Sequence, residues 1–468
     1  MRKMAKKPLG KDKDGIQKVM RAGDYFGDAL GQFSLNAISG LVGQLTYFYT
    51  DKVGLAAGAV GTAFLIVKIL DAFTDLIMGN IVDHTPAGKE RYRPWLLRMA
   101  VPAAVMIVLL FTVPTSISST AQLVYMFVTN FLLTAVIYTA ICIPYGSLMV
   151  VRTASQQERG YMGTWRAGAG YVAGMIIAVA IIPITNMLGG DQMAWIKFSV
   201  VLAVLTLIFL LICYKTGRET NPAEEAGTVP PDAEEAIPFF KAIVNLFHNR
   251  YWVIVLVLGL AANITYGLAN SAGTYYAKWI YGNDNLVGIQ GAVGLIPTVL
   301  GFALVGPLTK FLGVTKTLRV SFFIGMAANV LRLINPYDFV YNTVLGCFSS
   351  FANIPMMCLL GVLTAMAIDY NEYKFSNRML ATSQSASGFG SKVGSGLGTS
   401  MVAWCLAIAA YNPDAATASP ATVQAIFTFN IYVPLALFAL MFVLSILFDL
   451  EKRLPAIHEE IAKRKSAR

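Results

Sequence analysis

Charged residues are scarce in this sequence of 468 residues. Asp, Glu, Lys and Arg together make up 13% of it, whereas a soluble domain carries about a quarter. Hydrophobic residues make up 56%, and the mean hydropathy is +0.60. This composition excludes an ordinary cytosolic enzyme, a disordered protein and a disulfide scaffold.

The residue types that most often do chemistry are also few. The three histidines (His84, His248 and His458) fall between or beyond the apolar runs, so the sequence offers no histidine proton relay. The five cysteines lie inside apolar runs without C-x-x-C spacing, which predicts packing residues and neither a metal site nor a disulfide framework. The chain has no G-x-x-x-x-G-K-[ST] phosphate loop. We therefore expect no enzymatic activity and no cofactor, and an ion or solute gradient as the energy source.

What the sequence does contain is long apolar runs, each near the 20 or so residues that cross a bilayer as a helix. They predict an all-α membrane protein of twelve transmembrane helices, arranged as two six-helix bundles. The predicted parts are a tail (1–27), a first bundle (28–214), a linker (215–249), a second bundle (250–448) and a tail (449–468). The runs are 28–49, 56–82, 94–113, 120–150, 161–184, 193–214, 250–274, 286–308, 317–334, 338–368, 383–411 and 421–448.

The net charge of +10 is explained by topology and not by nucleic-acid binding. If both termini are cytoplasmic, 30 of the 36 Lys and Arg residues fall in cytoplasmic segments and four fall outside. Such an excess is typical of multi-pass membrane proteins. The basic N-terminus lacks the apolar stretch of a signal peptide. We expect a multi-pass protein of the bacterial inner membrane with both termini in the cytoplasm.

Three charges stand inside the second apolar run, where each costs roughly 2.5–3.5 kcal/mol. Lys68, Asp71 and Asp75 are spaced i, i+3 and i+7, which places them on one face of a helix. Two carboxylates one turn apart can bind a monovalent cation or hold a proton between them. The sequence predicts a cation-coupling site here, with Lys68 in its charge network; the alternative is a purely structural ion network.

Other polar residues in the apolar runs are further candidates. Lys392 lies in SASGFGSKVGSGLGTS, whose small residues permit close helix contact; alternatively it neutralises an acidic residue on a facing helix. Arg166 is a site residue or an interfacial arginine. Asp28 is a site residue or an N-cap of the first helix. Asn36 is a neutral polar group on that same helix.

Four segments carry a resemblance to a known family. They are DAFTDLIMGNIVDHTPAGKERYRPWL, YFYTDKVGL, YTAICIPYGSL and AIDYNEYKFSNR, and they fall in both halves of the chain. Weak internal repetition, such as Ile-Pro in runs 4 and 10, agrees with two similar halves. Together the segments resemble the glycoside–pentoside–hexuronide:cation symporters, relatives of melibiose permease in the major facilitator superfamily.

The resemblance implies the major facilitator fold and uptake of a sugar or glycoside coupled to H⁺ or Na⁺ by alternating access, as a functional monomer in the lipid bilayer. It assigns residues to three roles. For cation coupling it implies Asp71, Asp75, Thr139 and Lys392, with the two aspartates as metal ligands if the ion is Na⁺. For substrate binding we take Asp28, Asn36, Tyr145, Arg166 and Lys392, and for a gating loop Gly79, Asp83, Gly88, Lys89 and Arg91.

The sequence also departs from the family. Cys142 replaces a carboxylate before Ile-Pro, Gly146 replaces a tryptophan that contacts the sugar, and Leu380 replaces an acidic residue. The loss of carboxylates favours proton coupling over Na⁺ coupling. The alternative functions are a proton-coupled exporter of a small solute with the same fold, and a receptor or scaffold, which would have no use for these intramembrane charges.

Overall fold

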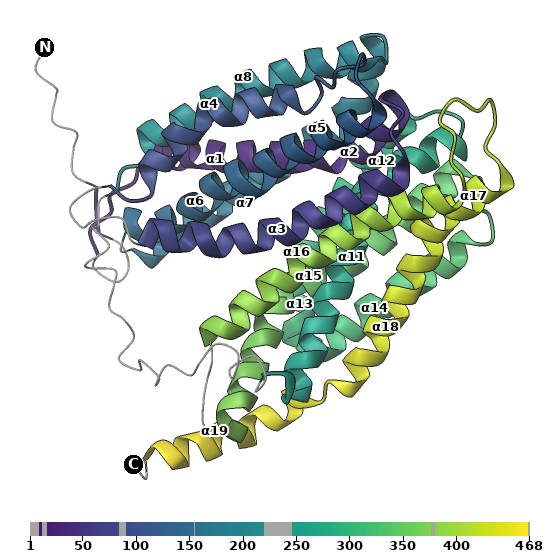
Figure 1. The fold of residues 1–468 in the computed structure, drawn as a ribbon. Coiled ribbons are helices and arrows are strands. Elements are labelled where there is room, and N and C mark those ends of the chain that lie inside the picture. The colour runs from purple at the N-terminus through teal and green to yellow at the C-terminus, as the bar shows by residue number, and fades with distance from the viewer. Residues whose placement is uncertain are drawn as a thin grey trace, which may run out of the picture. The chain divides into compact units, whose positions relative to one another are not determined.

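The computed structural model of this chain is built from helices, with no β-strand in the residues that it describes. Those residues are 9–11, 16–83, 90–153, 155–219, 246–375 and 380–466. Figure 1 shows the helices in chain order. With π-helical segments labelled η, the segments are α1 (Ala22–Gly43), α2 (Leu45–Tyr47), η1 (Phe48–Lys52), α3 (Ala57–Asp83), α4 (Arg93–Leu109), α5 (Ser119–Phe131), η2 (Leu132–Tyr138), α6 (Thr139–Arg152), α7 (Gln156–Met187), α8 (Gln192–Thr216), α11 (Arg250–Trp279), α12 (Leu286–Val293), α13 (Leu295–Leu312), α14 (Val314–Arg332), α15 (Phe339–Phe375), α16 (Leu380–Ile408), α17 (Pro420–Phe427), η3 (Thr428–Tyr432), α18 (Val433–Leu447) and α19 (Leu450–Ser466).

Each of the twelve predicted apolar runs coincides with helical structure in the described ranges, but some boundaries differ. The first helix begins at Ala22 because the Asp24 carboxylate accepts a hydrogen bond from the Arg21 amide at 2.8 Å, which caps the helix inside the polar segment. The eighth run is divided at Gly294 into α12 and α13. The C-terminal tail contains a further helix, α19, with ion pairs spaced four residues apart on its surface.

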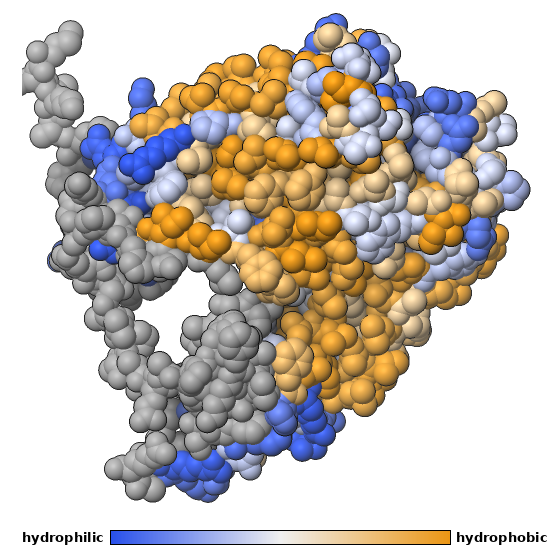
Figure 2. All heavy atoms as spheres, in the orientation of Figure 1, coloured by the Kyte–Doolittle hydropathy of each residue, from blue (hydrophilic) through white to orange (hydrophobic). Residues whose placement is uncertain are grey.

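Large apolar side chains lie exposed along many of these helices. On α13, for example, Ile296 is 61% exposed and Val299 is 65% exposed. Figure 2 shows apolar residues over much of the visible surface of the helices. Seven helical stretches in the described part of the chain are long and apolar enough to cross a bilayer. Apolar surface on this scale is typical of contact with lipid, and the chain is a multi-pass membrane protein.

The described helices group into two compact units. The first comprises Met1–Val42 and Phe73–Asp232, and the second comprises Gly43–Ala72 and Ala233–Arg468. The division therefore runs through α3, whose first half packs with the second unit and whose second half packs with the first. Whether residues 28–214 and 250–448 act as the two bundles predicted from the sequence stays a prediction.

In each unit a glutamate side chain caps the start of one helix. This shared feature agrees with the weak internal repetition of the sequence. Glu219, which follows α8, accepts a hydrogen bond at 2.8 Å from the Tyr92 amide at the start of α4. Glu451, which follows α18, accepts one at 2.7 Å from the Thr315 amide at the start of α14. A carboxylate stabilises such a helix start by accepting from its free N–H groups. In each unit an arginine of the capped helix also donates to a backbone carbonyl in the last turn of the helix that precedes the glutamate. Arg93 donates to Tyr214 of α8 at 2.7 Å, and Arg319 donates to Ser445 of α18 at 2.9 Å.

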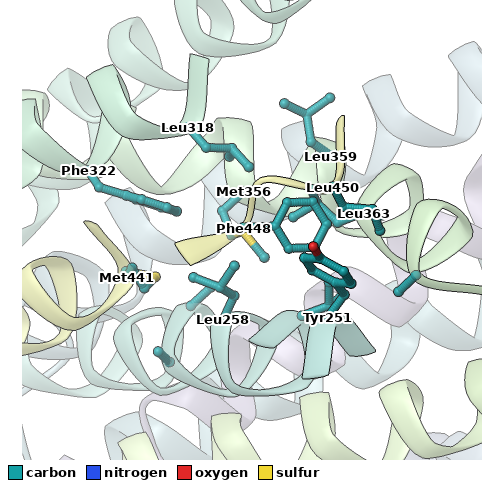
Figure 3. Close-up of a cluster of buried hydrophobic side chains, with 14 of the residues drawn as sticks. Tyr251, Leu258, Leu318, Phe322, Met356, Leu359, Leu363, Met441, Phe448 and Leu450 are labelled. Atoms are coloured by element: carbon teal, nitrogen blue, oxygen red, sulfur yellow. The ribbon is translucent and has the colours of Figure 1, made fainter. Parts of the chain in front are cut away.

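A hydrophobic core lies within the second unit among α11, α14, α15 and α18 (Figure 3). Its side chains include Leu258 of α11, Phe322 of α14, Met356 of α15 and Met441 of α18, none more than 1% exposed. Because lipid is as apolar as these side chains, the core stabilises the unit through close van der Waals packing. The core fixes α11 and α15, two of the helices that line the cavity described below.

Three π-helical segments interrupt the α-helices of the described ranges, and π-helical turns are frequent at functional sites. η2 ends directly before Thr139, and η3 ends directly before Val433 and Pro434. Pro434 has no backbone N–H, so it cannot donate to the carbonyl oxygen of Asn430, four residues earlier. That carbonyl is therefore available to a side chain.

Candidate functional site

The carboxylate of Asp71 lies between two lysines within the second unit. It is 4% exposed, and its Oδ1 accepts a hydrogen bond from Nζ of Lys392 on α16 at 2.9 Å. Its Oδ2 lies 3.6 Å from Nζ of Lys68, one turn earlier on α3. Lys392 also donates to the backbone carbonyl of Asp71 at 3.3 Å. These three side chains connect α3 and α16 and carry a net charge of +1.

Small residues bring α16 close enough for this contact. A Cβ atom built at Gly396 would lie 2.7 Å from Cβ of Lys68, closer than real Cβ atoms approach. On the opposite side of α16, a Cβ atom at Gly398 would overlap the carbonyl oxygen of Ile264 on α11. Glycine lets helix backbones approach closely inside a membrane. The glycine-rich sequence around Lys392 thus positions its ammonium group beside Asp71.

Asp75, one turn beyond Asp71 on α3, belongs to the first unit. Its Oδ1 accepts a hydrogen bond at 2.9 Å from the hydroxyl of Thr139, which is 2% exposed. Thr139 begins α6 directly after η2. This part of α3 packs against α4 and α6 through Met78 and Val82. The site therefore offers a buried hydroxyl and a carboxylate, which are oxygen donors suited to a hard cation or a proton.

Asp28, Arg166 and Arg152 form a second ion cluster, inside the first unit. The Asp28 carboxylate, 1% exposed, accepts from Nε of Arg166 at 2.6 Å and from Nη2 at 2.9 Å, a bidentate pair between α1 and α7. Nη1 of Arg152 donates to the same carboxylate at 3.1 Å. Arg152 also lies 3.9 Å from Asp24, so the four groups balance in charge.

Tyr145 completes this cluster. Its hydroxyl donates to the backbone carbonyl of Asp28 at 2.8 Å, and the Arg166 guanidinium lies 3.8 Å from the centre of its ring. A Cβ atom at Gly31 would lie 2.7 Å from the same ring, so glycine is required for α1 to approach it. The structure thus brings Asp28, Tyr145 and Arg166 together, as three of the predicted substrate-binding residues.

One of the alternatives left open by the sequence is wrong. Asp28 is not an N-cap, because α1 begins six residues earlier at Ala22. Arg166 is 7% exposed and lies in α7, which begins at Gln156; whether it stands at the membrane interface stays a prediction. In both cases the helix extends into a polar segment that hydropathy alone assigns to a tail or loop. The alternative for Lys392, an acidic partner on a facing helix, agrees with its contact to Asp71.

Asn36 lies apart from this ion cluster, two turns further along α1. Its side-chain oxygen accepts from Nε2 of Gln32 at 2.7 Å. A Cβ atom at Gly170 would lie 2.8 Å from its amide nitrogen, so α7 approaches α1 closely there.

The predicted gating loop is described only in part. Gly79 lies in α3 and Asp83 ends that helix. The Arg91 amide donates to Glu219 at 3.0 Å, as part of the cap of α4. Gly88 and Lys89 lie outside the described residues.

Sequence reasoning missed Asp51 in the second unit. Its side chain is 1% exposed, and Oδ1 accepts from Nζ of Lys278 at 2.6 Å and from the hydroxyl of Tyr411 at 2.7 Å. Beside it the hydroxyls of Thr50 and Tyr275 lie 2.6 Å apart. Asp51 was assigned to a loop because Lys52 follows it and no apolar run includes it. The available signal was its place in YFYTDKVGL, one of the segments that resemble the family.

Comparison with known proteins agrees with the resemblance. A family model described as "MFS/sugar transport protein" matches residues 29–452. The chain is 30% identical over 438 residues to the putative glycoside/cation symporter YagG of Escherichia coli (strain K12), covering 90% of this chain and 91% of that protein. It is 26% identical over 452 residues to the isoprimeverose transporter of Lactiplantibacillus pentosus, covering 94% and 91%. One further relative, 25% identical over 386 residues, is named a putative 2,3-dihydroxypropane-1-sulfonate exporter of Escherichia coli (strain K12). The more similar relatives are named symporters, so the exporter alternative is not favoured.

Among solved structures, the chain is similar to a bacterial homologue of the human lysosomal transporter Spinster, determined in an inward-facing and unoccupied conformation. The TM-score is 0.66 at 14% sequence identity, covering 93% of this chain and 98% of the other. At this identity the likeness concerns the fold alone. Together with the family model it confirms the major facilitator fold, with which the twelve helical runs agree.

Proposed function

Since the chain belongs to the MFS/sugar transport protein family, with a glycoside/cation symporter among its relatives, we propose that it imports a sugar or glycoside together with a monovalent cation. It acts as a monomer in the bacterial inner membrane with both termini in the cytoplasm. The observation that carries the proposal is the set of charges within α3: Asp71 is held between two lysines, and Asp75, one turn further, accepts a hydrogen bond from Thr139. A charge arrangement this costly inside a membrane protein marks an ion pathway more often than a structural element.

In this proposal the two carboxylates of α3 have different tasks. Asp71 anchors Lys392 and keeps α16 against α3, since both of its oxygens already face an ammonium group. Asp75 accepts a hydrogen bond from the neutral hydroxyl of Thr139 and is the carboxylate that receives the cation. Neutralising Asp75 removes one of the two negative charges that α3 carries one helical turn apart. The coupling is this change in charge balance on one helix, and it biases the conformations that bind sugar.

The coupling ion in this proposal is the proton. A hard metal cation needs several oxygen ligands, and Cys142 stands where the related symporters have a further carboxylate. Within the described ranges no three His, Cys, Asp or Glu side chains gather as they would around a metal ion. A proton needs one carboxylate and a hydrogen-bonding neighbour, which Asp75 and Thr139 supply.

A neutral glycoside or pentoside suits this charge arrangement better than a hexuronide. Arg166 and Lys392 are the basic residues that would bind a substrate carboxylate, but each is already paired with a buried aspartate at 2.6–2.9 Å. Asn36, at 2.7 Å from Gln32, presents neutral hydrogen-bonding groups of the kind that bind sugar hydroxyls. We assign Asn36 to direct sugar contact, and Asp28, Arg166 and Tyr145 to holding α1, α6 and α7 around it.

One co-transported proton supplies enough energy for useful accumulation. An elementary charge that crosses 100 mV releases about 2.3 kcal/mol. At about 1.4 kcal/mol per tenfold change, this concentrates a neutral sugar roughly 50-fold.

The experiment is uptake of a panel of labelled neutral glycosides, pentoses and hexuronides in cells that express the chain. Asp75→Asn and Asp71→Asn are run in parallel. The proposal expects accumulation of at least one neutral sugar by the wild type and loss of accumulation in Asp75→Asn, while counterflow of that sugar persists. Gradient-driven accumulation that is unchanged in both variants contradicts it, and so does accumulation of hexuronides alone.

A further inference from the structure

A small cavity lies within the second unit, among α11, α12, α14, α15, η3 and α18. Its volume is about 180 Å³, and its lining includes Gln290, Arg332, Thr343 and Asn430. A water molecule takes up roughly 30 Å³ of liquid, so the cavity holds a few waters or one small solute. It is smaller than the 300–1,000 Å³ or so of an ordinary ligand pocket.

The charge of Arg332 is not balanced by a nearby carboxylate. Its hydrogen bonds run to the Asn342 side-chain oxygen at 3.3 Å, the Asn329 side-chain oxygen at 3.4 Å and the Asn430 carbonyl at 3.1 Å. All three acceptors are neutral. Among the described residues no Asp or Glu lies within 4.0 Å of the guanidinium, whereas Arg166 and Lys392 each have such a partner. Arg332 ends α14, where the carbonyl groups of the last helical turn offer a cation only partial negative charge.

The surroundings of the cavity favour negative charge in two further ways. The Thr343 hydroxyl is buried and has no hydrogen-bond partner in the described part of the chain. No carboxylate lines the cavity. Pro434 has no N–H to donate to the Asn430 carbonyl oxygen. That oxygen instead accepts a hydrogen bond from Arg332 and so holds the guanidinium at the cavity wall.

We infer that this cavity binds one small monovalent anion, a halide or a short carboxylate, held by the guanidinium of Arg332 and the hydroxyl of Thr343. The site is separate from the α3–α16 charges and does not depend on the proposed sugar transport. Its role is to supply the countercharge that the polypeptide lacks at Arg332 and so to stabilise the packing of α14 against α15.

The test uses the purified full-length protein in detergent, with chloride as the probe. Bound chloride broadens the ³⁵Cl resonance, and acetate is then added as a competitor to separate a halide site from a carboxylate site. Arg319→Gln is the matched control, because Arg319 lies on the same helix but donates to the Ser445 carbonyl. If the wild type and Arg319→Gln both broaden the ³⁵Cl resonance and acetate reverses the broadening, one site binds both halides and carboxylates. Broadening that acetate leaves unchanged restricts the site to halides.

Arg332→Gln removes the charged hydrogen-bond donor, worth about 1.5–3 kcal/mol, so anion affinity falls about ten- to a hundredfold. Thr343→Val keeps the charge and shape and is expected to weaken binding about tenfold through loss of one hydrogen bond. It serves as the deciding variant if Arg332→Gln does not fold. No broadening by the wild type, or equal broadening by the wild type and Thr343→Val, overturns the inference and leaves a cavity filled with water.

Discussion

Replacing Asp28 with Asn removes the negative charge at the centre of the α1–α6–α7 cluster and keeps nearly the same volume. The carboxylate is 1% exposed and accepts three hydrogen bonds, at 2.6, 2.9 and 3.1 Å, from two guanidinium groups. In the variant Arg152 and Arg166 stay buried and lose the carboxylate that accepts hydrogen bonds from both of them. Removing one partner of a buried ion pair costs about 3–5 kcal/mol. The equilibrium constant for unfolding therefore rises on the order of 10²–10⁴-fold.

The assay is reversible unfolding of the purified protein in mixed micelles, followed by tryptophan fluorescence. Asp24→Asn is the matched control, since Asp24 is 35% exposed and its contact with Arg152 is long. The asparagine retains an oxygen that accepts from the Arg21 amide, so we expect a change of about 0–1 kcal/mol. The double variant Asp28→Asn with Arg152→Gln should recover part of the loss, because it removes one of the two positive charges that face residue 28.

If the free energies of unfolding of Asp28→Asn and Asp24→Asn differ by less than about 1 kcal/mol, Asp28 does not stabilise the protein as the countercharge of the two buried guanidinium groups. An unchanged stability of the double variant relative to Asp28→Asn would show that Arg152 is not part of the cluster's charge balance.

Three further predictions concern other parts of the molecule. Gly398→Ala should lower the free energy of unfolding by about 1–3 kcal/mol through overpacking against α11, whereas Gly388→Ala, on the same helix but with open space around it, should not; equal effects in the same unfolding assay contradict the packing. Thr139→Val should strengthen proton binding at Asp75 about tenfold, because it removes a hydrogen bond that stabilises the ionised carboxylate, seen as a lower proton concentration for half-maximal uptake; an unchanged value argues against Asp75 as the ion-binding carboxylate. Asp51→Asn should destabilise the protein by about 3–5 kcal/mol, because the ammonium group at 2.6 Å loses its countercharge; stability equal to the wild type would show that the pair contributes nothing.

The helices and the family were predictable from the sequence because their signals are local. A run of about 20 apolar residues specifies a membrane helix by length alone, and the segment from Asp71 to Leu96 carries the family resemblance in consecutive residues. The contact between Asp71 and Lys392 was foreseeable as a pairing of costly charges. Its geometry was not, because it depends on the backbone approach permitted by Gly396 and Gly398.

Residues outside the apolar runs were harder to place. Asp51 was assigned to a loop, although it is buried against Lys278, because hydropathy does not reveal a π-helical extension that carries a charge inward. Arg152 was counted as a cytoplasmic loop residue although it is 3% exposed at the end of α6. Arg332 stands near the end of the ninth apolar run, and no sequence pattern indicates a cavity beside it. These features arise from contacts between distant segments.

The central claim is that Asp75 carries the coupling proton, and proton movement on addition of substrate tests it most directly. De-energised cells in lightly buffered medium are given a sugar that the wild type accumulates, and the external pH is recorded. We expect alkalinisation by the wild type, and none by Asp75→Asn even though that variant still exchanges labelled sugar by counterflow. Alkalinisation by Asp75→Asn equal to that of the wild type, or substrate-driven Na⁺ entry without any pH change, would contradict it.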